Sequence, residues 1–146
     1  MIYKHTQIGY LEIFIILATI IIFGIVLIQA KFDIYIFSLM FFVLLILVSF
    51  VSLTVSVDEK YLRIKFGYGL YKKRFMLNQI ISARAVKNKW YYGWGIRIWF
   101  LPKMWIYNVS GFNAVEIKMK NNKIYRIGTD EPKRLERAIL KAIKSN

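Results

Sequence analysis

Two long apolar segments near the start of the chain dominate its hydropathy pattern. Residues 13–30 and 34–57 carry no charged side chain, and only the tripeptide KFD separates them. A helix needs about 20 mostly apolar residues to cross a bilayer. The pattern therefore predicts an antiparallel pair of transmembrane helices, with spans of about residues 10–30 and 34–52. The tail of the second segment, SLTVSV, alternates and is β-branched, which predicts that a strand begins there.

Period-two alternation continues through the rest of the chain and predicts half-buried strands. It is clearest in YLRIKF and VEIKMK, where apolar residues alternate with Arg, Lys or Glu. Turn-forming residues, such as the asparagines in KMKNNKIY, separate the predicted strands. The seven predicted strands are residues 53–57, 61–66, 70–77, 80–86, 96–100, 115–120 and 123–127.

The chain ends in a predicted amphipathic helix. Glu131 and Pro132 suit its first turn, and the apolar residues that follow recur at helical spacing, from Leu135 to Ile143. A narrow aliphatic stripe favours a helix packed on a sheet over one that lies on a membrane surface or on nucleic acid. The predicted fold is thus a membrane helical hairpin plus an α+β or all-β domain. That domain would be a seven-stranded β-sandwich or barrel capped by the C-terminal helix.

Charge is distributed very unevenly along the chain. Residues 8–57 contain only Glu12, Lys31 and Asp33, whereas residues 58–146 contain 20 Lys and Arg against 6 Asp and Glu, which accounts for the net charge of +14. We predict a membrane segment at 1–57 and a basic domain at 53–146, the strand 53–57 joining the two. Positive residues near the outer ends of both spans predict that both termini are cytoplasmic, in a multi-pass protein of the cell inner membrane.

The basic half resembles a known group of proteins. The residues that carry the likeness are 94–97 (WGIR), 107–111 (YNVSG) and 127–132 (IGTDEP). Together with the two spans and the strand count, they resemble the bacterial membrane proteins with a pleckstrin-homology (PH)-like domain, a group without an established function. Inositide-binding PH domains carry a basic pattern across their first hairpin. Lys60, Arg63 and Lys65 come near that pattern, but Lys65 replaces an Arg and the Asp58-Glu59 turn would repel phosphate.

Two sets of residues are candidate contact sites. The first is an aromatic segment around WFLPKMWIY, which we predict to touch the membrane or a partner; the alternative is that it forms core and edge cover. The second is a group of cations beside the second span, predicted to meet anionic phospholipid headgroups. The first set is Trp99, Phe100, Leu101, Lys103, Met104, Trp105 and Ile106, and the second is Lys60, Arg63, Lys65, Lys72, Lys73 and Arg74.

Little in the sequence points to catalysis. The only histidine, His5, falls in a terminus expected to be flexible, and Glu116 is expected to stand alone among lysines. The chain has no cysteine, and we expect no metal and no cofactor. Glu12 is expected to reach the membrane interface. The predicted function is a non-catalytic, membrane-anchored interaction module that binds a protein partner or a second copy of itself. The alternative is a module for anionic lipid surfaces, with nucleic-acid binding unlikely.

Overall fold

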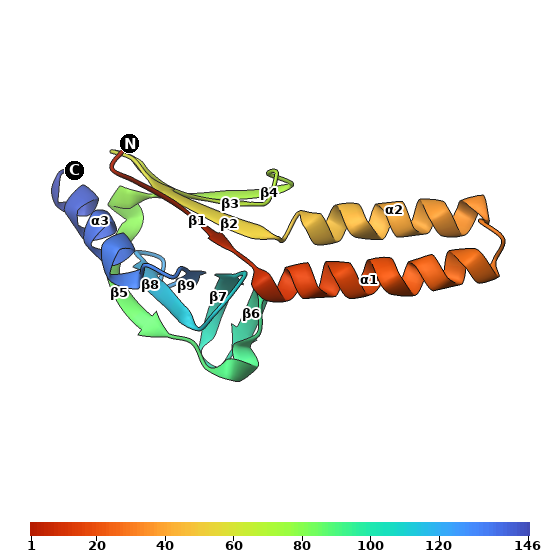
Figure 1. Ribbon diagram of the computed structural model, residues 1–146. Helices are drawn as coiled ribbons and strands as arrows, with labels where there is room; N and C mark the ends of the chain where they lie inside the picture. Colours follow the sequence, from red (N-terminus) through yellow and green to blue (C-terminus); the bar gives the residue numbers. More distant parts are fainter.

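The computed structural model describes all of residues 1–146 and contains three α-helices and nine β-strands. Two helices project side by side from a domain built of two sheets and the third helix, here called the β-domain (Figure 1). In chain order the elements are β1 Tyr3–Ile8, α1 Tyr10–Gln29, α2 Ile34–Val48, β2 Ser52–Val57, β3 Tyr61–Phe66, β4 Tyr71–Met76, β5 Ile80–Lys87, β6 Gly95–Phe100, β7 Lys103–Asn108, β8 Asn113–Met119, β9 Ile124–Gly128 and α3 Pro132–Lys144.

The projecting helices are apolar on every side. Leu27 is the only buried residue of α1, and α2 has none. A helix that is apolar all round needs an apolar environment. By length and composition α1 can cross a membrane, whereas α2, with 15 residues, is shorter than a usual span. Between the two helices the chain turns tightly, and the Asp33 carboxylate caps α2 by accepting hydrogen bonds from the N–H groups of Tyr35 and Ile36.

Strands β1 to β4 form an antiparallel sheet, here called sheet A, in the order β1-β2-β3-β4. Tyr3 lies opposite Val57 and Ile8 opposite Ser52, so β1 pairs along its whole length with β2. The helices α1 and α2 are therefore an insertion between two neighbouring strands. Assigning the first residues to the membrane segment was wrong, because they belong to the β-domain. The sequence pattern of β1 gave little indication of a strand, because its inward positions include the polar residues His5 and Gln7.

The helices join sheet A without a linker. The N–H group of Gly9 donates to the carbonyl of Val51 over 2.6 Å, at the point where the chain leaves and re-enters the sheet. The Tyr68 hydroxyl, in the turn between β3 and β4, donates to the carbonyl of Leu45 on α2 over 2.9 Å. One end of the β-domain is therefore held directly against the helices.

The other five strands form a mixed sheet, here called sheet B, in the order β5-β8-β9-β7-β6. All neighbours are antiparallel except β7 and β9, which are parallel. The helix-and-sheet class is as predicted, but the count of seven strands was wrong, because β1 and β7 were missed. Strand β7 was hidden inside the aromatic segment, where Leu101 and Pro102 form the turn of a hairpin between β6 and β7.

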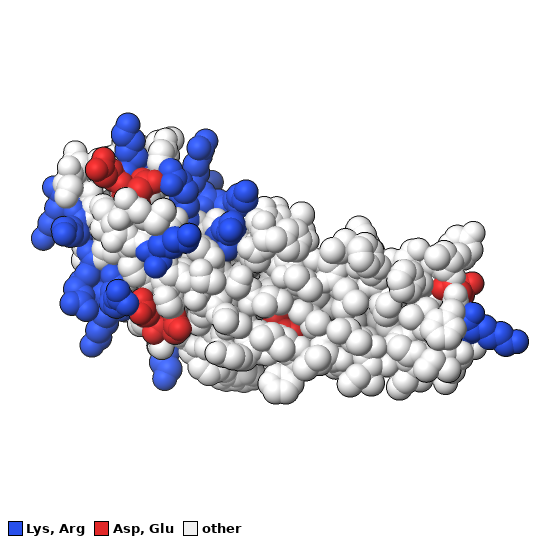
Figure 2. Space-filling view, turned by 45° about the horizontal axis from the view of Figure 1, so that its top comes forward, with Lys and Arg blue, Asp and Glu red and all other residues white.

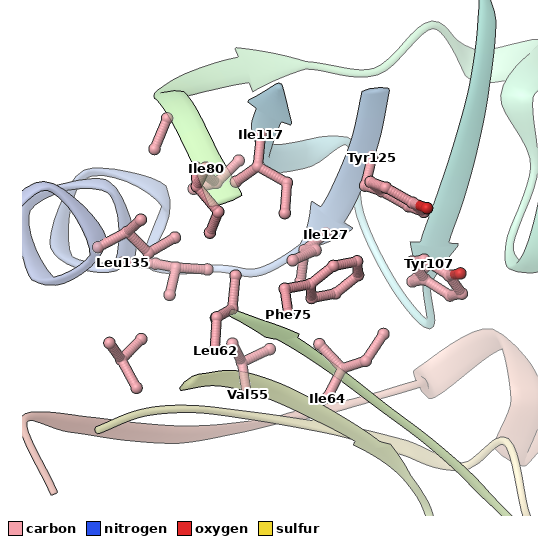
Figure 3. Packing of buried hydrophobic residues seen from close by; sticks show 14 of the residues in the cluster. Val55, Leu62, Ile64, Phe75, Ile80, Tyr107, Ile117, Tyr125, Ile127 and Leu135 are labelled. Atoms are coloured by element: carbon pink, nitrogen blue, oxygen red, sulfur yellow. The ribbon is translucent and has the colours of Figure 1, made fainter. Parts of the chain in front are cut away.

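The core lies between the two sheets, and α3 covers one end of it (Figures 1 and 3). Side chains from β2 and β3, such as Val55 and Leu62, face Ile117 and Ile127 of sheet B. Leu135 and Ile139 of α3 are fully buried in the same cluster, which confirms the predicted apolar stripe. Helix α3 therefore contributes to the core and leaves its basic residues on the surface.

Candidate functional site

The outer face of sheet A carries a group of cations that we call the cationic face: Lys4, Arg63, Lys65, Lys72 and Arg74. The register of the sheet places Arg63 directly opposite Arg74, and Lys65 directly opposite Lys72. Figure 2 shows Lys and Arg side chains gathered over the β-domain, whereas most of the surface of the two helices is free of them. Like charges directly opposite each other on a sheet are destabilising. The two facing pairs therefore place like charges together where an anionic group would relieve their repulsion.

Few acidic groups balance these charges. Asp58, in the turn between β2 and β3, pairs with Arg63 over 2.5 Å. Burial raises the pKa of Asp58, but hydrogen bonds from the backbone N–H groups of Lys60 and Tyr61 outweigh it, so the pKa lies below its usual range. The remaining cations of the face form no ion pair. A shallow depression of about 510 Å³ lies over the face, and Thr54 and Ser56 add hydroxyl groups to its lining.

The cationic face extends away from the helices. Strand β2 follows α2, and the strands of sheet A run from the helix end of the β-domain towards its far end (Figure 1). Lys65 and Lys72 lie near the helix end of the face. Arg63 and Arg74 lie two residues further along the strands, or about 7 Å. Lys60 lies beyond them, in the turn at the far end of β3.

Lys73 does not belong to the cationic face, so its assignment to headgroup contact was wrong. Alternation along β4 places Lys72 and Arg74 outside and turns Lys73 inward with Phe75. Its ammonium lies over four aromatic rings without a carboxylate partner, and burial, together with repulsion from Lys123, lowers the pKa of Lys73. The distances from Nζ to the ring centres are 4.8 Å for Tyr125, 5.5 Å for Trp105, 5.6 Å for Phe75 and 5.9 Å for Tyr107.

The turn of the β6–β7 hairpin is the exposed part of the aromatic segment. Phe100 is 76% exposed and Leu101 is 88% exposed, and Lys103 is exposed beside them. Trp99 is half-buried, because its ring packs on Tyr92 with 4.9 Å between ring centres. Its indole N–H donates to the carbonyl of Leu101 over 3.0 Å, which braces the turn.

The second strand of the hairpin is mostly core, which corrects the prediction for two of its residues. Met104 is 1% exposed and Ile106 is fully buried, and both pack with Tyr92 in a small cluster beside the main core. Trp105, on the opposite face of β7, is half-buried and stacks on Tyr107 with 6.5 Å between ring centres. Met104 and Ile106 therefore offer no surface to a membrane or a partner. Period-two alternation within KMWIYN could have identified them.

A pocket that sequence reasoning missed lies where α1 meets strand β6; we call it the helix–hairpin pocket. Its volume is about 370 Å³. Glu12, in the first turn of α1, and Arg97, on β6, line it together but form no ion pair. The sequence marked Glu12 as an interfacial residue but gave no reason to place Arg97, 85 positions later, beside it. The other lining residues are Leu11, Ile15, Phe50, Trp94, Gly95 and Ile96.

Two expectations about isolated polar groups were wrong. His5 lies in β1, and its Nε2 atom is 2.5 Å from a carboxylate oxygen of Asp130, so the N-terminal residues are tied to the start of α3. Glu116 is not isolated: it pairs with Arg126 over 2.8 Å and with Arg84 over 3.3 Å. The register places these two arginines opposite Glu116 on the flanking strands. Spacing along the chain could not show either contact.

The segments that suggested a known family are now placed in the fold. Residues 94–97 lead into and begin β6, residues 107–111 follow from the end of β7, and residues 127–132 connect β9 to α3. All three lie near ends of strands in sheet B. No family model, curated protein or solved structure matches this chain.

Proposed function

We propose that this protein is a membrane-anchored docking module whose cationic face binds an acidic surface of a protein partner. The observation that carries the proposal is the pairing of Arg63 with Arg74 and of Lys65 with Lys72 across the strands. Neighbouring like charges reduce the stability of a sheet, but they create a local field that attracts an anionic partner. A partner that supplies carboxylates would remove the repulsion and gain charge-assisted hydrogen bonds.

The topology of sheet A supports a membrane hairpin. Strands β1 and β2 are hydrogen-bonded neighbours, and α1 and α2 lie between them in the chain. If α1 crosses a membrane, the chain must return to the side from which it left in order to form β2. We therefore propose that α2, with its flanking turns, crosses back. The cations of the β-domain favour the cytoplasmic side, because positive residues near the ends of spans are retained there.

The strand order also supports the PH-like resemblance as a proposal. Setting aside the β6–β7 hairpin leaves seven strands, four in sheet A and three in sheet B, followed by the C-terminal helix. The number equals the one predicted from the sequence, but β1 takes the place of β6 among the seven strands, and the hairpin that is set aside contains parts of the segments 94–97 and 107–111 that suggested the resemblance. In this interpretation, the transmembrane pair and the β6–β7 hairpin are two insertions into a PH-like sandwich of a bacterial inner membrane protein.

The direction of the cationic face favours a protein over the lipid surface. Screening limits electrostatic attraction to about 8 Å at physiological ionic strength. Because the face extends away from the helices, Lys4, Arg63 and Arg74, which the register places in one row across the strands, lie about 7 Å further from the helix end than Lys65 and Lys72. Lys65 and Lys72 are the exception, since they lie near the helix end of the face. Their position supports the alternative function, in which the protein gathers anionic lipids around its anchor.

The test uses the full-length protein in nanodiscs of neutral lipid and a fluorescent Glu-rich peptide as the acidic probe. We expect saturable binding that weakens with salt and is lost in the double variant Lys72→Glu/Arg74→Glu. The matched control is Arg137→Glu/Lys141→Glu, which changes the net charge equally on exposed positions of α3.

If the two double variants weaken peptide binding equally, only net charge matters and the docking face is refuted. If the peptide does not bind, but anionic lipids co-purify with the wild type and not with Lys65→Glu/Lys72→Glu, the lipid alternative holds. Sidedness is tested separately with a reporter fused after Asn146, which we expect to be active only in the cytoplasm.

A further inference from the structure

We infer that the helix–hairpin pocket binds the headgroup of a zwitterionic phospholipid, in which Glu12 accepts hydrogen bonds from the ammonium group and Arg97 donates hydrogen bonds to the phosphate. The ligand class is a phosphoethanolamine lipid. The inference is distinct from docking on the cationic face, but it rests on the part of the proposed function that places α1 in a membrane.

The pocket lies at the depth where headgroups would be found. Glu12 is in the first turn of α1, immediately before the uncharged residues 13–30 that would enter the hydrocarbon core. The volume of the pocket, about 370 Å³, falls within the usual range for small-ligand sites. Leu11 and Ile15 continue the lining along α1 towards the lipid, so acyl chains could pack against the helix while the headgroup occupies the pocket.

Glu12 lacks a partner within the protein. Its carboxylate makes no ion pair, and no donor within the protein reaches it, although it is partly buried beside apolar side chains. A carboxylate near the hydrocarbon region is costly unless it is paired. A primary ammonium group would compensate the charge and supply N–H donors.

Arg97 is held in place with most of its donors free. Its Nε–H donates to the carbonyl of Trp94 over 3.0 Å, whereas the four N–H groups of its terminal nitrogens make no hydrogen bond in the protein. The adjoining turn depends on Gly93 and Gly95, which have φ values of 72° and 87° in the left-handed region. The guanidinium fork matches the geometry of phosphate oxygens.

Two unpaired groups of opposite charge in one pocket match a ligand that carries both charges. An anionic lipid with an uncharged alcohol headgroup would satisfy Arg97 but would bring its negative charge near Glu12. A simple cation would satisfy Glu12 and leave Arg97 free. In a phosphoethanolamine headgroup two carbon atoms link the ammonium and the phosphate. Trp94 is also among the lining residues, and tryptophan is favoured at the depth of the membrane interface.

Retention of lipid by the full-length protein in detergent tests the inference. Phosphoethanolamine and phosphoglycerol lipids with identical acyl chains are added in equal amounts, and native mass spectrometry measures the bound fraction. We expect the phosphoethanolamine lipid to be retained about tenfold more strongly, since a hydrogen bond to a charged group contributes enough for this factor. Glu12→Gln should abolish the preference, and Arg97→Gln should lower retention of both lipids. Water-soluble phosphoethanolamine, which lacks acyl chains, should not be retained.

Glu136→Gln and Arg137→Gln on α3 serve as matched controls, because α3 lies at the far end of the β-domain from α1 (Figure 1). Circular dichroism checks that each variant is folded. If Glu12→Gln fails to fold, Arg97→Lys serves as the test in its place. This variant keeps the positive charge but loses the planar guanidinium fork, so its lipid retention should lie between those of the wild type and Arg97→Gln. Equal retention of the two lipids, a preference unchanged by Glu12→Gln, or retention of the soluble compound alone would overturn the inference. Peptide binding at the cationic face should be unaffected by these variants, so the two proposals fail separately.

Discussion

The ammonium of Lys73 lies 4.8 Å from the centre of the Tyr125 ring, which joins the edge strand of sheet A to sheet B without a carboxylate. A partly desolvated cation over an aromatic face contributes about 1–2 kcal/mol. Three further rings surround the same nitrogen. These contacts connect the two sheets. They also give a reason for a lysine at an inward position, where an apolar residue would be expected.

Replacing Lys73 with Gln should therefore lower the free energy of unfolding by about 1–2 kcal/mol. Chemical denaturation of the detergent-solubilised protein, followed by tryptophan fluorescence, measures it. Lys72→Gln is the matched control, because Lys72 points outward on the same strand. We expect no loss of stability for it, since the change relieves repulsion with Lys65. Equal losses in both variants would show that the aromatic rings do not hold Lys73.

Stability should fall on the alkaline side because of buried tyrosines. Burial raises the pKa of Tyr3 from its usual 10.0 to about 12, and burial also raises the pKa of Tyr107. The unfolded chain therefore loses these phenolic protons first, so the stabilising contribution is complete below pH 10 and is lost as the pH rises towards 12. Tyr3→Phe should make the decline of unfolding temperature in this window shallower. Tyr91→Phe, at an exposed position, is the control; identical slopes for both would contradict the assignment.

Arg74→Glu should stabilise the protein while weakening its binding. The new carboxylate would lie directly opposite Arg63 and exchange a repulsive cross-strand pair for an attractive one, a gain of about 0.5–1 kcal/mol. The same change removes a cation from the docking face. Thermal unfolding and peptide anisotropy on one preparation measure both effects. A loss of stability would show that the facing arginines do not repel each other in the folded protein.

The two strands of the aromatic hairpin should respond differently to truncation. Leu101→Ser changes an 88% exposed side chain and should alter the free energy of unfolding by less than about 0.5 kcal/mol. Ile106→Ala removes a fully buried side chain and should cost about 2–5 kcal/mol. Denaturant midpoints of the two variants give the comparison. A stable Ile106→Ala protein would mean that β7 does not belong to the core.

Elements with a strong local pattern were predictable from the sequence. Residues 61–66 alternate cleanly and form β3 with the same bounds, and α3 begins at Pro132, with Glu131 just before the first turn and not within it. Strand β1 was not predictable, because its inward positions include polar side chains and its partner lies more than 40 residues away, beyond both helices.

The candidate sites likewise contain features that the sequence shows and features that only the fold shows. The cations of β3 and β4 were visible in the sequence, but only the register shows that Arg63 faces Arg74 and that Lys73 turns inward. That Glu12 and Arg97 line one pocket depends on how sheet B sits against α1, which no local pattern encodes. Periodicity identifies which side of a strand a residue occupies, whereas long-range pairing decides what it meets.

The insertion of both helices between β1 and β2 constrains how the chain matures. The first strand leaves the ribosome before either helix, yet its hydrogen-bonding partner is made only after the second helix has been synthesised. The sheet therefore cannot close until both helices have been synthesised and the chain has returned to the β-domain. Premature collapse of the amino-terminal strand would leave the returning strand without its neighbour, so completion of the sandwich depends on the first strand staying available until the second has been made.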